Sequence, residues 1–285
     1  SREHFVLSTD SDDCTNSSIM KSVLLLLLTP LASARTVLVT GATGQTGSLA
    51  YLQLKKDPNV TVRAFVRDLA KAKAKLGCNK CDESEGVFVG DVTKKETLVA
   101  AMANVDVLLI AVGAVSNAYA VFVQGTRNQI EAFATAPGPA VQEKQVVKVS
   151  TMDTTKFVSR VLSPFFYHGV SDQYISVAGI PFTIVQPCGL ADAKTPANTN
   201  KLLVSRDDLP FQDGKSGSIY RADVAQVIAY AATHPKEAAW LKFDLCADPK
   251  QKPEGAEEQV MQGVFKKALL PWDPRAKTSA THIVV

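Results

Sequence analysis

The sequence has few cysteines, little net charge and no long hydrophobic run among its 285 residues. Five cysteines are too few for the disulfide framework of a small secreted scaffold. A formal net charge of +3 lacks the basic excess of nucleic-acid-binding proteins, so we expect no nucleic-acid partner. The most uniformly apolar stretch, Val23 to Leu28, is far shorter than the roughly 20 residues of a membrane-spanning helix. We therefore expect no membrane span in the mature chain.

The overall composition is that of a soluble globular protein. Hydrophobic residues make up 46% of the chain and charged residues 21%, which excludes a disordered chain, a collagen-like repeat and a coiled coil. A doubly wound α/β domain fills roughly 250 residues, so the length fits one such domain preceded by a leader.

The N-terminal segment resembles a leader in its composition. Met20-Lys21 gives a positive start, the leucine run gives a hydrophobic centre, and Ala32-Ser33-Ala34 gives a small-residue cleavage site. This pattern predicts a signal peptide over residues 20–34, within a leader of residues 1–34. A disordered extension with a chance leucine run is the alternative. Cleavage at this site would leave Arg35 as the first residue, directly at the start of a strand.

From Thr36 onward, the apolar periodicity alternates between short strands and amphipathic helices. Continuous apolar strands suit a parallel sheet that is covered on both faces. The repeated β-α-β order predicts an α/β fold with a doubly wound parallel sheet, the Rossmann fold, in a single domain over residues 35–285. The expected strands are 36–40, 60–66, 87–89, 105–112, 146–150, 182–186 and 241–245, and the expected helices are 47–56, 69–76, 95–103, 118–136, 167–178, 221–233 and 257–269.

A glycine-rich loop stands between the first strand and the first helix. Gly41, Gly44 and Gly47 have the spacing G-x-x-G-x-x-G in the segment TVLVTGATGQTG. The first glycine permits a tight turn, the second lets the backbone approach a pyrophosphate, and the third lets the helix pack against the strand. The helix N-terminus then offers free N–H groups to phosphate oxygens. This context predicts nucleotide binding; a tight turn without a ligand is the alternative.

The end of the second strand indicates which nucleotide is bound. NAD-specific sites place an acidic residue about 20 residues past the loop, where it accepts hydrogen bonds from the ribose. Arg67 stands at this position, and its guanidinium suits the 2′-phosphate of NADP(H). Asp68 follows and is expected to be the N-cap of the next helix. A solvated surface charge is the alternative role for Arg67.

Two further strand ends contribute candidate cofactor contacts. Gly90-Asp91-Val92 closes the third strand, where an aspartate can contact the adenine amino group. An N-cap of the stretch beginning near Thr93 is the alternative role for Asp91, and both roles are compatible. The fourth strand ends in small residues from Ala111 to Ala114, which leave room for a ribose or a nicotinamide beside the backbone.

These motifs together resemble the atypical short-chain dehydrogenase/reductase family, and within it the NAD(P)-binding, NmrA-like subgroup of plant plastids. The similarity covers roughly residues 36–270, through the segments TGATGQTG, VRAFVRD, GDV, VVKVSTM, TIVQPCGL, RADVAQV, KLLVSRDDL and GTRNQIEAF. It implies a Rossmann fold with bound NADP(H). It also implies cofactor contacts from Gly41, Thr43, Gly44, Gln45, Thr46, Gly47, Arg67, Asp91, Val92 and Ala111, and near the nicotinamide from Ser150, Met152 and Pro187.

The catalytic pattern of the family is incomplete in this chain. Active short-chain reductases pair a serine after the fifth strand with Tyr-x-x-x-Lys on the next helix, where the ammonium lowers the pKa of the phenol. Ser150 and Tyr167 match the serine and the tyrosine, but Ser171 stands where the lysine belongs. Val170 occupies the position at which the plastid subgroup carries a lysine. We therefore expect Ser150 and Tyr167 as catalytic candidates, with any activating cation supplied by a distant part of the chain.

The cysteines and histidines do not form a recognisable metal site, and we predict none. Cys78 and Cys81 form a C-x-x-C pair, for which a redox or disulfide role and two inert loop thiols remain open. Cys188 and Cys246 are isolated in the sequence, and the four histidines are scattered.

Two classes of function follow from these observations. The first is an NADP(H)-dependent oxidoreductase whose small organic substrate is held by the region after Cys188, with residues 188–285 forming the substrate side. The second is a non-catalytic, nucleotide-binding sensor or assembly partner of a plastid complex. The leader and the family resemblance together predict a plastid that is reached through the secretory pathway. The alternative is the secretory lumen or secretion.

Overall fold

The computed structural model describes residues 34–114, 116–154, 165–192, 197–208, 217–270 and 273. The expected leader lies outside the described residues apart from Ala34, so the predicted signal peptide is not addressed by the structure.

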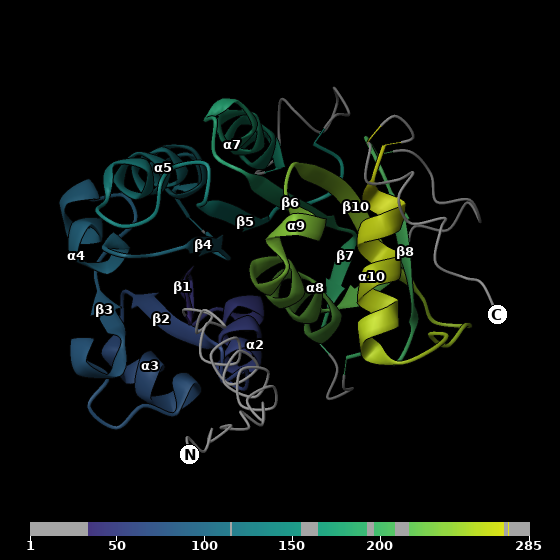
Figure 1. Cartoon of the computed structure of the whole chain (residues 1–285), viewed down its shortest axis with the longest axis horizontal. Coiled ribbons are helices and arrows are strands. Elements are labelled where there is room, and N and C mark those ends of the chain that lie inside the picture. The colour runs from purple at the N-terminus through teal and green to yellow at the C-terminus, as the bar shows by residue number, and fades with distance from the viewer. Residues whose placement is uncertain are drawn as a thin grey trace, which may run out of the picture. The chain divides into compact units, whose positions relative to one another are not determined.

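An eight-stranded sheet forms the centre of the fold (Figure 1). Seven neighbouring strands are parallel, and only the edge strand β8 runs antiparallel to β10. The order is β3-β2-β1-β4-β5-β6-β10-β8, with a separate two-stranded sheet of β7 and β9. The strands are β1 (Arg35–Thr40), β2 (Val60–Val66), β3 (Val87–Val89), β4 (Val107–Ile110), β5 (Gln145–Val149), β6 (Phe182–Pro187), β7 (Gly189–Ala191), β8 (Lys201–Ser205), β9 (Ser218–Tyr220) and β10 (Leu241–Asp248). This order confirms the predicted doubly wound α/β fold.

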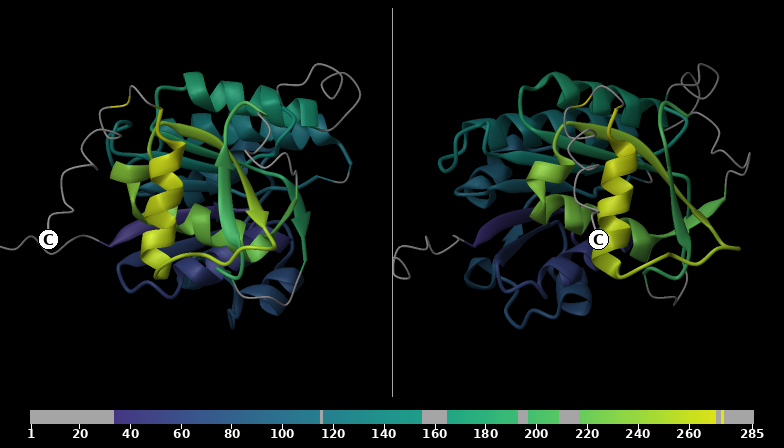
Figure 2. Two further views of the ribbon diagram at one scale, coloured as in Figure 1. Left: turned by 90° about the vertical axis from the view of Figure 1, so that its right-hand side faces the viewer. Right: turned by 45° about the vertical axis from the view of Figure 1, so that its right-hand side comes forward.

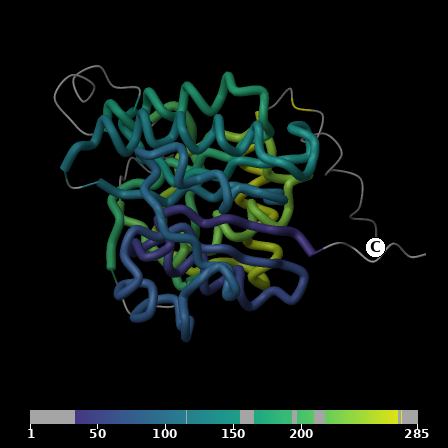
Figure 3. The backbone as a smooth tube through the Cα atoms, turned by 90° about the vertical axis from the view of Figure 1, so that its left-hand side faces the viewer, coloured from purple at the N-terminus to yellow at the C-terminus, as the bar shows by residue number. Residues whose placement is uncertain are grey.

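Helices cover both faces of the sheet, as Figure 2 shows from two sides. One face packs against α2 (Gln45–Leu54), α3 (Leu69–Leu76), α8 (Arg221–Thr233) and α10 (Glu257–Ala268). The other packs against α4 (Val99–Met102), α5 (Gly125–Thr135) and α7 (Phe165–Val177). In the backbone tube of Figure 3, strand β1 crosses the middle of the molecule, with α7 along one side. Shorter turns are η1 (Glu83–Glu85), η2 (Lys95–Leu98), the π-helical η3 (Tyr119–Gln124) and α9 (Pro235–Ala238).

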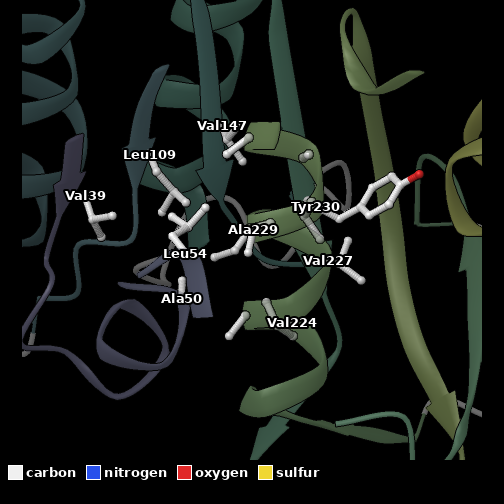
Figure 4. Close-up of a cluster of buried hydrophobic side chains, with 14 of the residues drawn as sticks. Val39, Ala50, Leu54, Leu109, Val147, Val224, Val227, Ala229 and Tyr230 are labelled. Carbon is white, nitrogen blue, oxygen red and sulfur yellow. The ribbon is translucent and has the colours of Figure 1, made fainter. Parts of the chain in front are cut away.

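Helix α8 lies in the densest part of the core. Ten of its thirteen residues are buried, a pattern typical of a helix that is covered on all sides. Its alanines and valines are small enough to approach both α2 and the sheet closely. Figure 4 shows Ala229 of α8 near Leu54 of α2, with Val227 on the opposite side of the helix. Arg221, the first residue of α8, lies near Gln45 after the glycine loop, because both side chains bond to Asp192.

Most expected elements are present, with differences at their ends. The strands 60–66 and 87–89 and the helices 69–76 and 221–233 have the expected bounds. The first helix begins at Gln45 rather than Gly47, because Gly44 in extended conformation is its N-cap. The expected helix 118–136 begins with the π-helical turn η3, and the expected strand 105–112 is shorter at both ends. The strands β7, β8 and β9 are additional.

The cysteine expectations need correction. Cys188 and Cys246 are bonded to each other, although they are separated by 58 residues and gave no sign of pairing in the sequence. Adjacent strand ends bring them together, since the amide of Cys188 donates to the carbonyl of Leu245. Cys78 and Cys81 are also bonded, which decides the open alternative in favour of a disulfide over free thiols.

Candidate active site

The glycine loop lies where the strand order reverses, between β1 and β4. In open α/β sheets, ligands bind at this switch point, outside the carboxyl ends of the strands. Gly41 has φ of +74°, and a Cβ there would lie 2.4 Å from the carbonyl oxygen of Ala111. A Cβ on Gly47 would lie 2.3 Å from the carbonyl oxygen of Gly41. Gly41 is therefore required where the loop meets the residue after β4, and Gly47 is required where α2 packs on the loop.

Helix α2 points its N-terminus into this cleft. Its N-cap, Gly44, brings no side chain to the first turn, so the amides from Gln45 to Gly47 have no intrahelical acceptor. Together with the positive end of the helix dipole, these amides can hold a phosphate. The loop thus has the shape and polarity that a pyrophosphate requires.

A first cavity, which we call the β2-side cavity, extends from the loop towards β2 and encloses about 450 Å³. Three cations line it: Arg67 after β2, and Lys71 and Lys75 one turn apart on α3. All three are exposed and available to a ligand. The other predicted contacts that line this cavity are Gly41, Thr43, Gly44, Gln45, Val92 and Ala111.

The two aspartates near this cavity have local partners. Asp68 accepts hydrogen bonds from the amides of Ala70 and Lys71, at 2.9 and 3.2 Å, which confirms its prediction as an N-cap. Asp91 accepts from the amide and the hydroxyl of Thr93, at 2.9 and 2.8 Å. The backbone bond from Thr93 foremost lowers the pKa of Asp91, with a contribution from Arg67. Asp91 does not line the cavity, and the helical turn η2 begins beyond it, at Lys95.

A second cavity, the β5-side cavity, extends from the same loop towards β5 and β6 and encloses about 780 Å³. The two cavities adjoin at the loop, where they share the lining residues Gly44, Gln45, Ala111, Val112 and Gly113. The predicted residues Thr46, Ser150, Met152 and Pro187 all line the β5-side cavity. The structure therefore brings most of the predicted contacts around one groove.

Ser150 is fixed from behind by a buried ion pair. Its Oγ donates to Oδ2 of Asp172 at 2.6 Å, and Nζ of Lys148 donates to Oδ1 of the same carboxylate at 2.6 Å. The side chains of Lys148 and Asp172 are 2% and 1% exposed. Lys148 also donates to the hydroxyl of Ser171. Burial lowers the pKa of Lys148, and the charge of Asp172 opposes this effect. Lys148 is thus a cation from a distant segment of the chain, but its ammonium pairs with Asp172.

Tyr167 is not among the residues that line the β5-side cavity. Its ring lies edge-on against Tyr119 and Phe166, at 5.8 and 5.6 Å between centroids. The next residue, His168, lines the cavity instead and packs on Phe122 at 4.0 Å. Burial lowers the pKa of His168 to about 3, helped by the charge of Lys148, so the imidazole is neutral near pH 7. Ser150 and Tyr167 therefore do not share this cavity.

Several lining residues were not predicted from the sequence. Lys71 and Lys75 lie four residues apart, a spacing that places them on one helix face behind Arg67. Arg221 is the one cation among the described residues that line the β5-side cavity. Lys148 had a visible signal, because a lysine inside the apolar strand VVKVS requires a buried partner.

A possible metal-binding cluster among the described residues is closed by a disulfide. Cys78, Cys81 and Glu85 are close enough to hold a metal ion, but the two sulfurs are bonded to each other. Glu85 accepts from the amides of Asn79, Lys80 and Cys81, which closes the loop. Within the described ranges, no helix has the length and apolarity to cross a membrane.

The chain is similar to NAD(P)-binding proteins in sequence and in fold. A family model described as NAD(P)H-binding matches residues 41–235. An uncharacterised chloroplastic protein of Arabidopsis thaliana is 31% identical over 244 residues, which cover 75% of this chain and 70% of that protein. Sanguinarine reductase of Eschscholzia californica is 28% identical over 279 residues, covering 83% of this chain and 97% of that protein.

The fold is shared with a solved structure. A Rossmann-fold NAD(P)-binding family protein from Shigella flexneri matches with a TM-score of 0.58 and 18% identity. The match covers 78% of this chain and 98% of that one. At this identity, the likeness shows the fold alone.

Proposed function

The chain belongs to the NAD(P)H-binding family of atypical short-chain dehydrogenase/reductases, and from this membership we propose that it is an NADPH-dependent reductase of a small organic acceptor. The observation that carries the proposal is that the two cavities adjoin at the glycine loop and share lining residues there. One cavity offers cations to an adenosine phosphate, and the other offers Ser150 to an acceptor. The volume of about 780 Å³ lies within the roughly 300–1,000 Å³ of small-molecule sites.

The preference for NADP(H) over NAD(H) is supported by the charge of the β2-side cavity. Arg67, Lys71 and Lys75 line it, and an additional phosphate at the 2′ position would find a guanidinium and two ammonium groups there. Asp68, the nearest acidic residue, accepts hydrogen bonds from the first turn of α3. One oxygen of this carboxylate, Oδ1, is thus engaged by the helix.

The β5-side cavity is the proposed place of reduction. A bound nicotinamide supplies a hydride there. We assign Ser150 as the residue that contacts the acceptor, since it lines the cavity and its hydroxyl is held by Asp172 at 2.6 Å. Met152, Pro187 and the small residues after β4 would enclose the nicotinamide. Tyr167 stays a secondary candidate whose ring packs against Tyr119 and Phe166.

A nucleotide-binding sensor or assembly partner is the second candidate function. It is favoured by the absence of a lysine from the described residues of α7, and by the neutral His168 in the acceptor cavity. A general acid contributes about 10²- to 10⁴-fold to rates, and the described cavity lining holds no phenol or imidazolium for this role.

Turnover distinguishes the two candidates. The protein is mixed with NADPH and a panel of quinones and aromatic carbonyls, and the absorbance of the reduced nicotinamide is followed. We expect steady oxidation with at least one acceptor, and a matched Ser150→Ala variant that binds NADPH but reacts more slowly. Binding of NADPH without oxidation by any member of the panel would favour the sensor.

A plastid is the proposed location. The support is the chloroplastic relative from Arabidopsis thaliana. Entry through the secretory pathway depends on the expected signal peptide at residues 20–34 and remains a prediction. A fluorescent fusion of the full chain tests the proposed location, and the expected result is fluorescence in the plastid. Cytosolic fluorescence from a fusion that retains residues 20–34 contradicts both the location and the signal peptide.

A further inference from the structure

Three distant segments meet at the mouth of the β5-side cavity. The carboxylate of Asp192, directly after β7, accepts from Nε2 of Gln45 at 3.0 Å through one oxygen. Its other oxygen is 2.5 Å from Nη1 of Arg221, the first residue of α8. Gln45 and Arg221 both line the cavity, and Gln45 is also the first residue of α2. An internal anion therefore bridges the glycine loop and α8.

Arg221 is far less exposed than Asp192, whereas Gln45 is exposed like the aspartate. The Arg221 side chain is only 18% exposed, whereas that of Asp192 is 62% exposed. An arginine that is mostly buried beside a cavity retains its charge and needs an anionic partner. The exposed aspartate is a weak partner, because water competes for its carboxylate. A ligand oxyanion that enters the cleft can replace it on the same two donors.

The charge distribution in the groove indicates which oxyanion this is. Arg67, Lys71 and Lys75 are on the far side of the loop, in the β2-side cavity. Arg221 is the one cation that the described part of the chain places in the β5-side cavity. Gln45 begins the helix whose free amides face the cleft, so an oxyanion held by Gln45 and Arg221 lies at the N-terminus of α2.

We propose that Arg221 and Gln45 bind the pyrophosphate of the dinucleotide, and that the Asp192 carboxylate occupies this oxyanion position until the dinucleotide displaces it. The inference rests on the proposed function, because it presumes that the groove takes a dinucleotide. Asp192 then acts as an internal competitor. The apparent affinity for the dinucleotide is the intrinsic affinity multiplied by the fraction of molecules in which Asp192 does not occupy the two donors. Arg221 is a binding residue, and Asp192 sets how tightly the groove holds its cofactor.

Calorimetric titration of the full chain with NADPH tests the proposal without requiring turnover. Arg221→Gln should weaken binding roughly 10- to 100-fold, the effect of losing a hydrogen bond from a charged group. Asp192→Asn, which keeps an oxygen for Gln45 but removes the charge, should tighten binding about 3- to 10-fold. Arg127→Gln is the matched control, since Arg127 pairs with Glu131 on an exposed surface, lines neither cavity and should not change the affinity.

Two shortened probes identify the group that Arg221 holds. 2′-Phospho-ADP-ribose retains the pyrophosphate, whereas adenosine 2′-monophosphate carries neither of its two phosphates. Arg221→Gln should weaken the first as much as NADPH and leave the second nearly unchanged. If NADPH affinity is unchanged while the KM of an acidic acceptor rises, Arg221 binds the acceptor and the proposal is overturned. Equal affinity of wild type and both variants also overturns it, while leaving the proposed function intact. Absence of NADPH binding by the wild type overturns both.

Discussion

The disulfide between Cys188 and Cys246 should contribute a large part of the stability of the fold. The bond closes a loop with a sequence separation of 58 residues. In the chain-entropy treatment, such a loop stabilises the native state by about 4 kcal/mol, because the unfolded chain loses freedom. Cys188 and Cys246 are 9% and 0% exposed, so the bond lies within the packed structure. Replacement of both residues by alanine should lower the free energy of unfolding by about this amount.

Thermal denaturation followed by circular dichroism measures this effect. For a domain of this size, a loss of about 4 kcal/mol corresponds to a Tm lower by roughly 8–16 °C. Cys78→Ala with Cys81→Ala is the matched control, because that bond spans a separation of only 3 residues and should stabilise about half as much or less. A Cys188→Ala/Cys246→Ala variant within about 1 kcal/mol of wild type would refute the argument.

Three further predictions concern single residues. Arg67→Ala should narrow the preference for NADPH over NADH, since each lost charge-assisted bond is worth ~1.5–3 kcal/mol. Calorimetry that shows equal affinities of the wild type for NADPH and NADH would contradict this prediction. Tyr167→Phe should leave NADPH binding intact and change turnover by less than about tenfold, because the ring is not part of the cavity lining. A loss of 10²- to 10⁴-fold would restore the phenol as general acid. Burial raises the pKa of Asp244 from 3.8 to about 7, and the negative charge of Asp208 adds to this shift. Between these two values the native state holds a proton that the unfolded chain releases. The free energy of unfolding should therefore fall as the pH rises from about 4 to about 7. Asp244→Asn should therefore raise Tm more at about pH 8 than at about pH 5, and an equal effect at both pH values would contradict this.

The cofactor loop was predictable because its signals are local. Gly41 and Gly47 stand at fixed positions between an apolar strand and a helix, and their close contacts depend on a backbone turn of a few residues. Arg67 is predictable for the same reason, because its place follows from counting residues past the loop. The sheet order followed from β-α-β alternation and right-handed crossovers.

The groups that depend on long-range pairing were not predictable. Lys148 and Asp172 are 24 residues apart and meet only because α7 packs on β5. Cys188 and Cys246 meet because β6 and β10 are neighbours in the sheet, although helix α8 separates them in sequence. The position of Tyr167 outside the cavity lining depends on the direction in which α7 presents its first turn, which periodicity alone does not give.

The central claim is that the two cavities form one NADP(H) site that leaves Ser150 facing an acceptor. A crystal structure of the protein with NADP⁺ tests this claim most directly. We expect the 2′-phosphate within hydrogen-bond distance of Arg67 and the nicotinamide in the β5-side cavity beside Ser150. A dinucleotide whose nicotinamide lies outside that cavity, or whose 2′-phosphate contacts none of the three cations, would contradict it.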